Sequence, residues 1–470
     1  MDADEFRKRG HEAVERIARY YDEIGKYKVL SSVAPGYLAK SLPDHAPEEP
    51  ESWASIQADF ESKIMPGVTH WQHPSFFAFY PANSSYPGIL GDMYSSMINC
   101  IAFNWQSSPS CTELETITLD WVAKMCNLDK SFLSSGKGGG IIQGTASEAV
   151  LIAVIAARER VLQQYRNCNA SENELSSVAS RLMAYGSTQT HSCTKKACRI
   201  LNLKFTSIQT DETYRMRGVA LKEQIEKDSN AGFIPFYLTA TIGTTSSGAV
   251  DAIPELVDTL KSRGSMNEQS PIWLHVDAAY AGAAMVCPEH QHHLIGTDYA
   301  DSYNFNAHKW MLVNFDCSLM DWQLPLGRRF RSLKLWFVLR TYGVRGIQEH
   351  IRKHVGQAHR FHELLQSRNH IFNVVTRPHF ALVTFQIKPS PVMTFGGTDE
   401  TRQITRQVLD TVNASGAMFL TPTELNANYV IRFVPGSRDT QNQHIDNAFN
   451  ALLEAAQMVR ERRSRSNPKL

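Results

Sequence analysis

The chain begins with a stretch in which apolar residues recur at the spacing of a helix. Residues 3–24 place five of them on one stripe, which predicts an amphipathic helix. The stripe consists of Phe6, Val14, Ile17, Tyr21 and Ile24. A proline-rich connector and a second predicted helix over residues 53–64 complete this arm. Because so thin an arm has little core of its own, we expect it to pack on another surface, and a partner subunit is a natural candidate.

From about residue 85, short apolar runs alternate with helical stretches. The runs at 141–144, 234–240, 272–277 and 303–306 predict strands, and residues 147–164 predict a helix. This alternation is typical of an α/β layer, in which helices cover a largely parallel sheet.

Beyond residue 334 the pattern indicates a smaller α+β domain. It predicts helices at 334–343, 400–412 and 441–461 and strands at 381–387 and 429–434. We therefore expect three segments, which are an N-terminal helical dimerisation arm (1–84), a large α/β domain (85–333) and a small C-terminal domain (334–470).

Composition excludes several classes of protein. With 48 Lys and Arg against 47 Asp and Glu, the net charge is +1, so no global field would attract nucleic acid or an anionic membrane. The N-terminus lacks the apolar stretch of a secretion signal, and the longest apolar run, 149–157, is too short to span a bilayer. The eight cysteines have the spacing of neither a zinc site nor a disulfide framework. Free thiols predict a reducing compartment, and hence the cytoplasm.

A glycine-rich segment, GKGGGIIQGTASEA, leads into the predicted helix that begins near residue 147. Thr145 and Glu148 have the spacing of a capping box, so free N–H groups should converge at this helix start, where a phosphate would fit. On this motif alone an ordinary helix cap remains the better interpretation. The pattern is neither a dinucleotide fingerprint nor a P-loop.

Three further residues could carry chemistry. Asp277 ends an apolar strand, where a carboxylate could keep a heterocyclic nitrogen protonated or could form a structural ion pair. Lys309 follows the next strand among apolar and aromatic residues, which favour a neutral amine able to form a Schiff base, although lysines with apolar surroundings are common. His191 follows a strand-like run and could be a surface histidine or a base over a cofactor ring. Their order along the chain, after the phosphate-type helix start, favours a cofactor site.

The chain resembles the group II pyridoxal-phosphate-dependent decarboxylases, most closely the aromatic-L-amino-acid decarboxylases. The resemblance covers nearly the whole chain, and its motifs are PGVTHWQHPSFFAFYP, CTELETITLDWVAKM, GGGIIQGTASEA, WLHVDAAYAGAA, FNAHKWMLVNFDCS and PLGRRFRSLKLWFV. Motifs of this length in one order are highly specific. The resemblance implies the transferase-like fold of fold-type I enzymes that use pyridoxal 5'-phosphate, together with this cofactor.

The resemblance also implies roles for single residues. Lys309 would hold the cofactor by a Schiff base, Asp277 would pair with its pyridine nitrogen, and His191 would stack on its ring and help manage protons. The other residues expected around the cofactor are Ala146, Ser147, Thr245, Ala279, Asn306 and His308.

The substrate pocket of the family has an aromatic wall. The matching residues here are Trp71, Phe79, Tyr80, Pro81 and Ala82, with His191, Gly327 and, donated by the second subunit of an expected homodimer, Ile101 and Phe103. An apolar pocket favours an aromatic side chain over an acidic one. Phe79 and Tyr80 stand in the reverse of the family order, and Ala82 replaces a polar threonine. Gly327 matches a glycine of indole-preferring members, which is a hint towards tryptophan.

The largest departure from the family follows Met320. Roughly thirty residues of a mobile catalytic lid, including the tyrosine thought to protonate the substrate's Cα, have no counterpart before the pattern resumes at residue 325. Either the predicted gene lacks a segment or the loss is real. The sequence therefore predicts decarboxylation of tryptophan, tyrosine or dopa to an amine. It leaves open an aldehyde synthase, which decarboxylates and oxidatively deaminates, and an inactive dimer with a binding or regulatory role.

Overall fold

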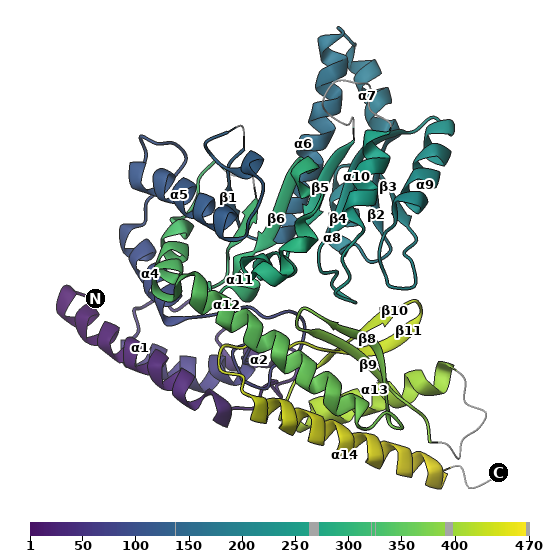
Figure 1. Ribbon diagram of the computed structural model, residues 1–470. Coiled ribbons are helices and arrows are strands. Elements are labelled where there is room, and N and C mark those ends of the chain that lie inside the picture. Colours follow the sequence, from purple (N-terminus) through teal and green to yellow (C-terminus); the bar gives the residue numbers. More distant parts are fainter. Residues whose placement is uncertain (137, 263–271, 321, 325, 391–397, 467–470) are drawn as a thin grey trace. The chain divides into compact units, whose positions relative to one another are not determined.

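The computed structural model describes residues 1–136, 138–262, 272–320, 322–324, 326–390 and 398–466 (Figure 1). The chain forms two compact units. Unit 1 comprises Met1–Pro81, Gln357–Arg377 and Val383–Leu470, and unit 2 comprises Ala82–Gly356 and Pro378–Leu382. By contacts, the N-terminal arm therefore belongs with the C-terminal segments, while the three-segment division made from the sequence remains a prediction.

Unit 2 is built on a seven-stranded mixed sheet. Its order is β1 (Ile141–Gln143), β7 (Ser318–Met320), β6 (Ser302–Asn306), β5 (Trp273–Asp277), β4 (Ile234–Thr241), β2 (Leu182–Ser187) and β3 (Lys204–Ile208). The last five strands in this order are parallel, and β7 runs antiparallel to both β1 and β6. The predicted α/β layer with a mostly parallel sheet is confirmed.

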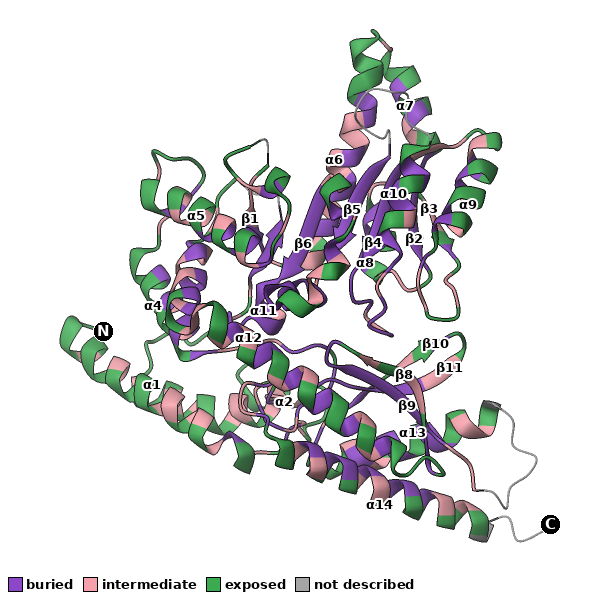
Figure 2. Cartoon of the chain, viewed as in Figure 1, coloured by how far each residue is buried: buried purple, intermediate pink, exposed green. Residues whose placement is uncertain are grey.

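Helices cover both faces of this sheet. Helices α6 (Ala146–Asn167) and α8 (Ser192–Ile200) lie together on one face, and α9 (Gly218–Asn230) and α10 (Ile253–Lys261) lie together on the other. The inner side of α6 carries fully buried alanines, including Ala149 and Ala153, which let the helix lie close to the strands. Figure 2 shows the central strands as buried almost throughout, as expected for parallel strands covered on both faces.

The remaining elements of unit 2 surround this sandwich. They are α4 (Tyr86–Ile98), α5 (Pro109–Met125), α7 (Glu172–Arg181), α11 (Ala307–Trp310) and the first part of α12 (Arg331–Gln366). The sequence predicted only the start of α12. This helix is interrupted at Gly343, whose φ of +62° and ψ of 179° are not helical.

Unit 1 contains a four-stranded sheet in the order β10 (Thr421–Leu425), β11 (Asn428–Phe433), β9 (Leu382–Ile387) and β8 (Phe372–His379). Its helices are α1 (Ala3–Glu23), α2 (Tyr37–Ser41), α3 (Trp53–Asp59), α13 (Thr398–Ser415) and α14 (Asn442–Ser466). The two predicted strands are β9 and β11. Strands β8 and β10 were missed because they are partly exposed and carry polar residues. Phe433 stacks on Phe361 with ring centroids 3.7 Å apart, which marks the centre of this core.

Helix α1 forms as its apolar spacing predicts, with Asp2 capping its first turn. No residue of α1 is buried, and Phe6 is 69% exposed. Among the described residues, no helix is both long enough and apolar enough to cross a membrane.

Candidate active site

The sequence-predicted residues Asp277, Lys309 and His191 all lie at one edge of the unit 2 sheet. Asp277 is the last residue of β5, Lys309 lies in α11 directly after β6, and His191 caps α8 just beyond β2. Because β2, β5 and β6 are parallel, their carboxyl ends share this edge, where open α/β sheets bind ligands. The Asp277 charge raises the pKa of His191 and the Lys309 charge lowers it, as expected for groups that share this edge.

Asp277 is a buried carboxylate with a fixed orientation. It is 3% exposed, and its Oδ1 accepts a hydrogen bond of 3.0 Å from the Ala279 N–H. The carbonyl of Ala279 in turn accepts from the Asn306 N–H at 3.0 Å. Ala279 therefore joins the ends of β5 and β6, and it holds the aspartate at the sheet edge.

His191 occupies an exposed position at the start of α8. Its Nδ1 accepts a hydrogen bond of 3.2 Å from the Cys193 N–H. Protein atoms packed around the ring lower the pKa of His191 below 6.5, Lys309 lowers it further, and Asp277 opposes both effects. A neutral imidazole whose Nδ1 is an acceptor follows, so the ring carries its proton on Nε2.

The start of α6 has the cap expected from the sequence, with one difference. Thr145 Oγ1 accepts from the Glu148 N–H at 3.3 Å, as in a capping box. The Glu148 carboxylate does not reach back to Thr145, however, and instead accepts from the Gly144 N–H at 2.9 Å. The prediction of a complete capping box was therefore wrong, because Glu148 braces the turn one residue earlier. Ala146 is half-buried and Ser147 is exposed at the positive end of the helix dipole.

Thr245 lies in a tight loop after β4. The loop begins at Gly243 and ends at Gly248, with φ of +82° and +72°, which a side chain would strain. Thr244 Oγ1 and Ser247 Oγ are 2.7 Å apart and close the turn, leaving Thr245 half-buried.

His308 fixes the segment that carries Lys309. Its Nδ1 accepts from the Cys317 N–H at 2.9 Å, and burial, assisted by the Lys309 cation, lowers the pKa of His308 to about 4. The His308 carbonyl accepts from the Asn83 N–H at 2.6 Å. Ala82, next to Asn83, is thus brought close to the Lys309 segment, whereas Lys309 itself is half-buried.

Four residues of the aromatic wall predicted from the sequence lie in unit 1, where two of them are exposed and two are buried. Trp71 and Phe79 stack with centroids 5.5 Å apart and are 38% and 43% exposed. Tyr80, in contrast, is 7% exposed under the guanidinium of Arg432, which lies 4.8 Å from its ring centroid, and Pro81 is also buried. The structure therefore presents the Phe79 ring at the surface and keeps the Tyr80 ring in the core.

Arg432 is a residue that the sequence reasoning missed. It also donates from Nη2 to the Phe79 carbonyl at 3.3 Å, and it thereby supports the backbone of Phe79, whose φ is +54°. Its only signal in the sequence was a cation inside the apolar run YVIRFV.

The residues expected from a second subunit lie in unit 2. Ile101 is 63% exposed and Phe103 is 46% exposed. The Ala102 N–H between them donates to the Arg328 carbonyl at 3.1 Å. A Cβ on Gly327 would lie 3.1 Å from Ile101 Cγ2, so Gly327 and Ile101 are in contact.

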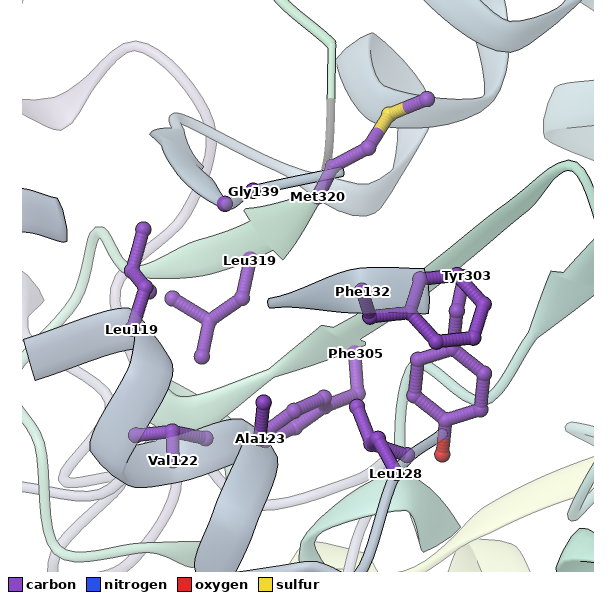
Figure 3. Close-up of a pocket in the computed structure, with 11 residues that line it drawn as sticks. Leu119, Val122, Ala123, Leu128, Phe132, Gly139, Tyr303, Phe305, Leu319 and Met320 are labelled. Carbon is purple, nitrogen blue, oxygen red and sulfur yellow. The ribbon is translucent and has the colours of Figure 1, made fainter. Parts of the chain in front are cut away.

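A separate small pocket lies between helix α5 and strands β6 and β7 (Figure 3). It offers about 40 Å³, and its lining is almost entirely apolar, including Leu119, Phe132, Tyr303 and Phe305. Space of this size holds only a few water molecules at about 10–15 Å³ each, so it cannot take an aromatic amino acid.

The family follows from comparison with known proteins. The model of the pyridoxal-dependent decarboxylase conserved domain matches residues 35–321 and 319–388. The chain belongs to this family. It is 44% identical to tryptophan decarboxylase 2 of Oryza sativa subsp. japonica, over 98% of this chain and 96% of that protein, and 43% identical to phenylacetaldehyde synthase of Arabidopsis thaliana, over 97% and 96%. A crystal structure of Oryza sativa TDC with PLP matches 98% of this chain and 99% of its own, with a TM-score of 0.92 and 36% identity.

The same comparisons bear on the missing segment. The two stretches matched by the family model meet at residues 319–321. The alignment with the Oryza sativa relative runs over 497 residues, although 98% of this 470-residue chain takes part, so about 36 positions of that relative have no partner here. The interruption expected after Met320 therefore coincides with the break in the family match. In this decarboxylase β7 carries the chain away from the Lys309 edge, because it is antiparallel to β6.

The residues present fit pyridoxal 5'-phosphate, the cofactor of this carboxy-lyase family. The buried Thr241 Oγ1 and Asn306 Oδ1 have no hydrogen-bond partner among the described residues, and they end β4 and β6 on either side of Asp277. A carboxylate for a ring nitrogen, an amine for an aldehyde and a helix start for a phosphate thus share one sheet edge.

Proposed function

We propose that this decarboxylase converts an aromatic L-amino acid, of the tryptophan, tyrosine or dopa type, to the arylalkylamine and CO2. The observation that carries the proposal is the meeting of Asp277, Lys309 and His191 at one sheet edge. Relatives of this chain bear the names of tryptophan, tyrosine and aromatic-L-amino-acid decarboxylases, which supports the reaction without choosing among the substrates.

The bound cofactor supplies the electron sink for the bond that breaks to release CO2. Lys309 holds the cofactor through its amine, and Asp277 keeps a proton on the ring nitrogen. The first turn of α6, at Ala146 and Ser147, binds the phosphate with the half-buried Thr245. His191 would lie over the ring with a neutral imidazole, whose Nε2–H could donate to the substrate carboxylate.

The exposed stacked rings of Trp71 and Phe79 support an aromatic substrate. A flat apolar side chain gains about 0.5–1.5 kcal/mol from stacking beyond its burial, and no acidic side chain shares this gain. Ala82 and Phe79 together remove two polar groups expected in the family's pocket, which favours rings without hydroxyl groups.

An aldehyde synthase is the second candidate, favoured by the lost segment after Met320. A lid excludes water and oxygen from an active site, and its absence would open the reacting centre to both. A relative of this chain is named phenylacetaldehyde synthase. The retention of His191 favours the amine over the aldehyde as product.

Product analysis separates these candidates. The purified protein is incubated with pyridoxal phosphate and tryptophan, tyrosine or dopa, and amine, aldehyde, ammonia and peroxide are measured. Amine without peroxide supports the proposal, whereas aldehyde with equal amounts of ammonia and peroxide replaces it with the synthase. Lys309→Ala should abolish product and the visible absorbance of bound cofactor, whereas Lys196→Ala, on the exposed side of α8, should change neither. Cofactor bound at Lys309 without either product would contradict both enzymatic candidates for these substrates, and no bound cofactor would favour an inactive dimer.

We also propose that the protein is a cytoplasmic homodimer in which Ile101 and Phe103 complete the partner's site. Their exposure in the single chain supports this arrangement. Mixing Lys309→Ala with Phe103→Ala chains should then restore activity that neither variant has, because a mixed dimer contains one intact site. No restored activity in verified mixed dimers would contradict a shared site, and cell fractionation tests the compartment.

A further inference from the structure

Three buried side chains behind Asp277 form a chain of hydrogen bonds. Trp273 Nε1 and His275 Nδ1 both contact the hydroxyl of Ser302, at 2.7 Å and 2.8 Å. Trp273 and His275 lie on β5, two residues apart on the face that also carries Asp277, and Ser302 pairs with His275 from β6. This series of hydrogen bonds therefore runs along the sheet face towards the edge proposed to bind the cofactor.

The donors in this chain determine the proton position on His275. An indole nitrogen only donates, so Ser302 Oγ accepts from Trp273. The Ser302 hydroxyl proton then points to His275 Nδ1, because no other acceptor for it is present among the described residues. Burial lowers the pKa of His275 to about 4, with Asp277 acting in the opposite direction, so the ring is neutral and carries its proton on Nε2.

The side chain of Asn304 interacts with the ring of His275 and raises its pKa, against the effect of burial. His275 Nε2 and both amide atoms of Asn304 are buried, and none of them makes a hydrogen bond of full geometry to a described residue. Asn304 stands directly opposite Asp277 in the β5–β6 register. An unsatisfied buried polar group costs about 1–3 kcal/mol, so three such atoms beside one carboxylate are costly unless they serve the site.

We propose that His275 is a positioning residue that presents a fixed Nε2–H towards the Asp277–Asn304 pair and so helps to hold the Asp277 carboxylate in place for the ring nitrogen of the cofactor. The buried Asp277 carboxylate accepts a hydrogen bond from the Ala279 N–H, and an N–H dipole directed towards it from His275 would stabilise its charge. The opposite tautomer would aim a lone pair at the same place. Ser302 and Trp273 act through His275 by excluding that tautomer. The inference rests on the proposed pairing of Asp277 with the ring nitrogen of the cofactor, and it is independent of which product is formed.

Two substitutions of His275 separate this role from simple packing. His275→Gln can keep a donor near the Nε2 position, whereas His275→Asn keeps a polar group near Ser302 and loses that donor. Thr239→Val is the matched control, because Thr239 is fully buried beside His275 on β4 and its hydroxyl bonds to Tyr237. For each variant the Kd for pyridoxal phosphate is measured by titrating the cofactor-free protein, together with its melting temperature and the pH dependence of the visible absorbance once loaded.

His275→Asn should raise the Kd about tenfold, because the buried N–H dipole that faces the Asp277–Asn304 pair is lost, and shift the pH dependence of the absorbance. His275→Gln should stay within about threefold of the parent, although both variants lower the melting temperature of the cofactor-free protein alike. Ser302→Ala should shift the absorbance in the direction of His275→Asn, which keeps the proposal testable if the latter fails to fold.

Equal Kd values for His275→Asn and His275→Gln, or a Kd change in Thr239→Val as large as in His275→Asn, would overturn the proposal. Asp277→Asn distinguishes this failure from that of the proposed function. If Asp277→Asn leaves cofactor affinity and absorbance unchanged, the pairing of Asp277 with the ring nitrogen fails. If it changes them while His275→Asn does not, only the role of His275 fails.

Discussion

The Glu115–Arg328 ion pair should stabilise unit 2 strongly, because it anchors the point at which the shortened connection after β7 rejoins the fold. The two side chains are only 12% and 9% exposed. Glu115 Oε1 also accepts from the Ile142 N–H of β1 at 3.0 Å, and the Arg328 carbonyl accepts from Ala102. Glu115→Gln retains an acceptor for Ile142 but leaves the Arg328 cation buried without its counter-charge. Breaking a buried pair in this way costs about 3–5 kcal/mol. Because both side chains keep some exposure to solvent, we expect a loss at the lower end of this range, about 3 kcal/mol.

Urea denaturation of the cofactor-free protein, followed by tryptophan fluorescence, measures this loss. Arg328→Met should cost a similar amount, and the double variant should cost less than the sum of the single variants by about 2 kcal/mol or more, since it leaves no unpaired charge. The control is Glu289→Gln, which breaks the exposed Glu289–Arg352 pair and should cost less than about 1 kcal/mol. A loss for Glu115→Gln no larger than that control would refute the reasoning.

Three further outcomes are expected. Phe79→Tyr should raise the kcat/KM for tyrosine or dopa relative to tryptophan, because it adds a hydroxyl group to an exposed ring of the aromatic wall. Tyr80→Phe, in the core, should leave this ratio unchanged. Equal effects of the two substitutions would contradict the assignment of Phe79 to the surface and Tyr80 to the core. Gly343→Ala should lower the free energy of unfolding by about 1–3 kcal/mol, because its φ of +62° and ψ of 179° suit glycine alone and no neighbour lies within 4 Å of the added Cβ. The folded-state pKa of His308, about 4, lies below its unfolded value of 6.5, so its contribution to stability is complete above pH 6.5 and is lost as the pH falls towards 4. His308→Gln should therefore flatten the melting temperature between pH 6.5 and 4, and an unchanged slope would count against this assignment.

Much of the fold could be predicted because buried parallel strands and long amphipathic helices leave strong patterns. The apolar run ending at Asp277 and the helix after Thr145 lie within three residues of their expected bounds. Strands β8 and β10 were missed because they are partly exposed and carry polar residues. The grouping of the N-terminal arm with the C-terminal segments could not be predicted, since it depends on contacts between residues far apart in sequence.

The candidate site could be predicted where each functional residue lies at or just after the end of a single strand. Asp277 ends a strand, and Lys309 and His191 follow strands, so parallel pairing is enough to bring them together. The placement of Tyr80 was not predictable, because alternation does not continue through the positive φ at Phe79 and its partner Arg432 is 352 residues away. The chain from Trp273 through Ser302 to His275 was also hidden, because it requires the register between β5 and β6.

Borohydride reduction of the holoenzyme tests the central claim, which is that Lys309 holds the cofactor. Reduction fixes pyridoxal phosphate to the lysine that binds it, and peptide mapping by mass spectrometry identifies that residue. The account predicts the modification on Lys309, at about one group per chain, and its absence from Lys309→Ala. Modification of another lysine in the parent protein, or of none in a protein saturated with the cofactor, would contradict it.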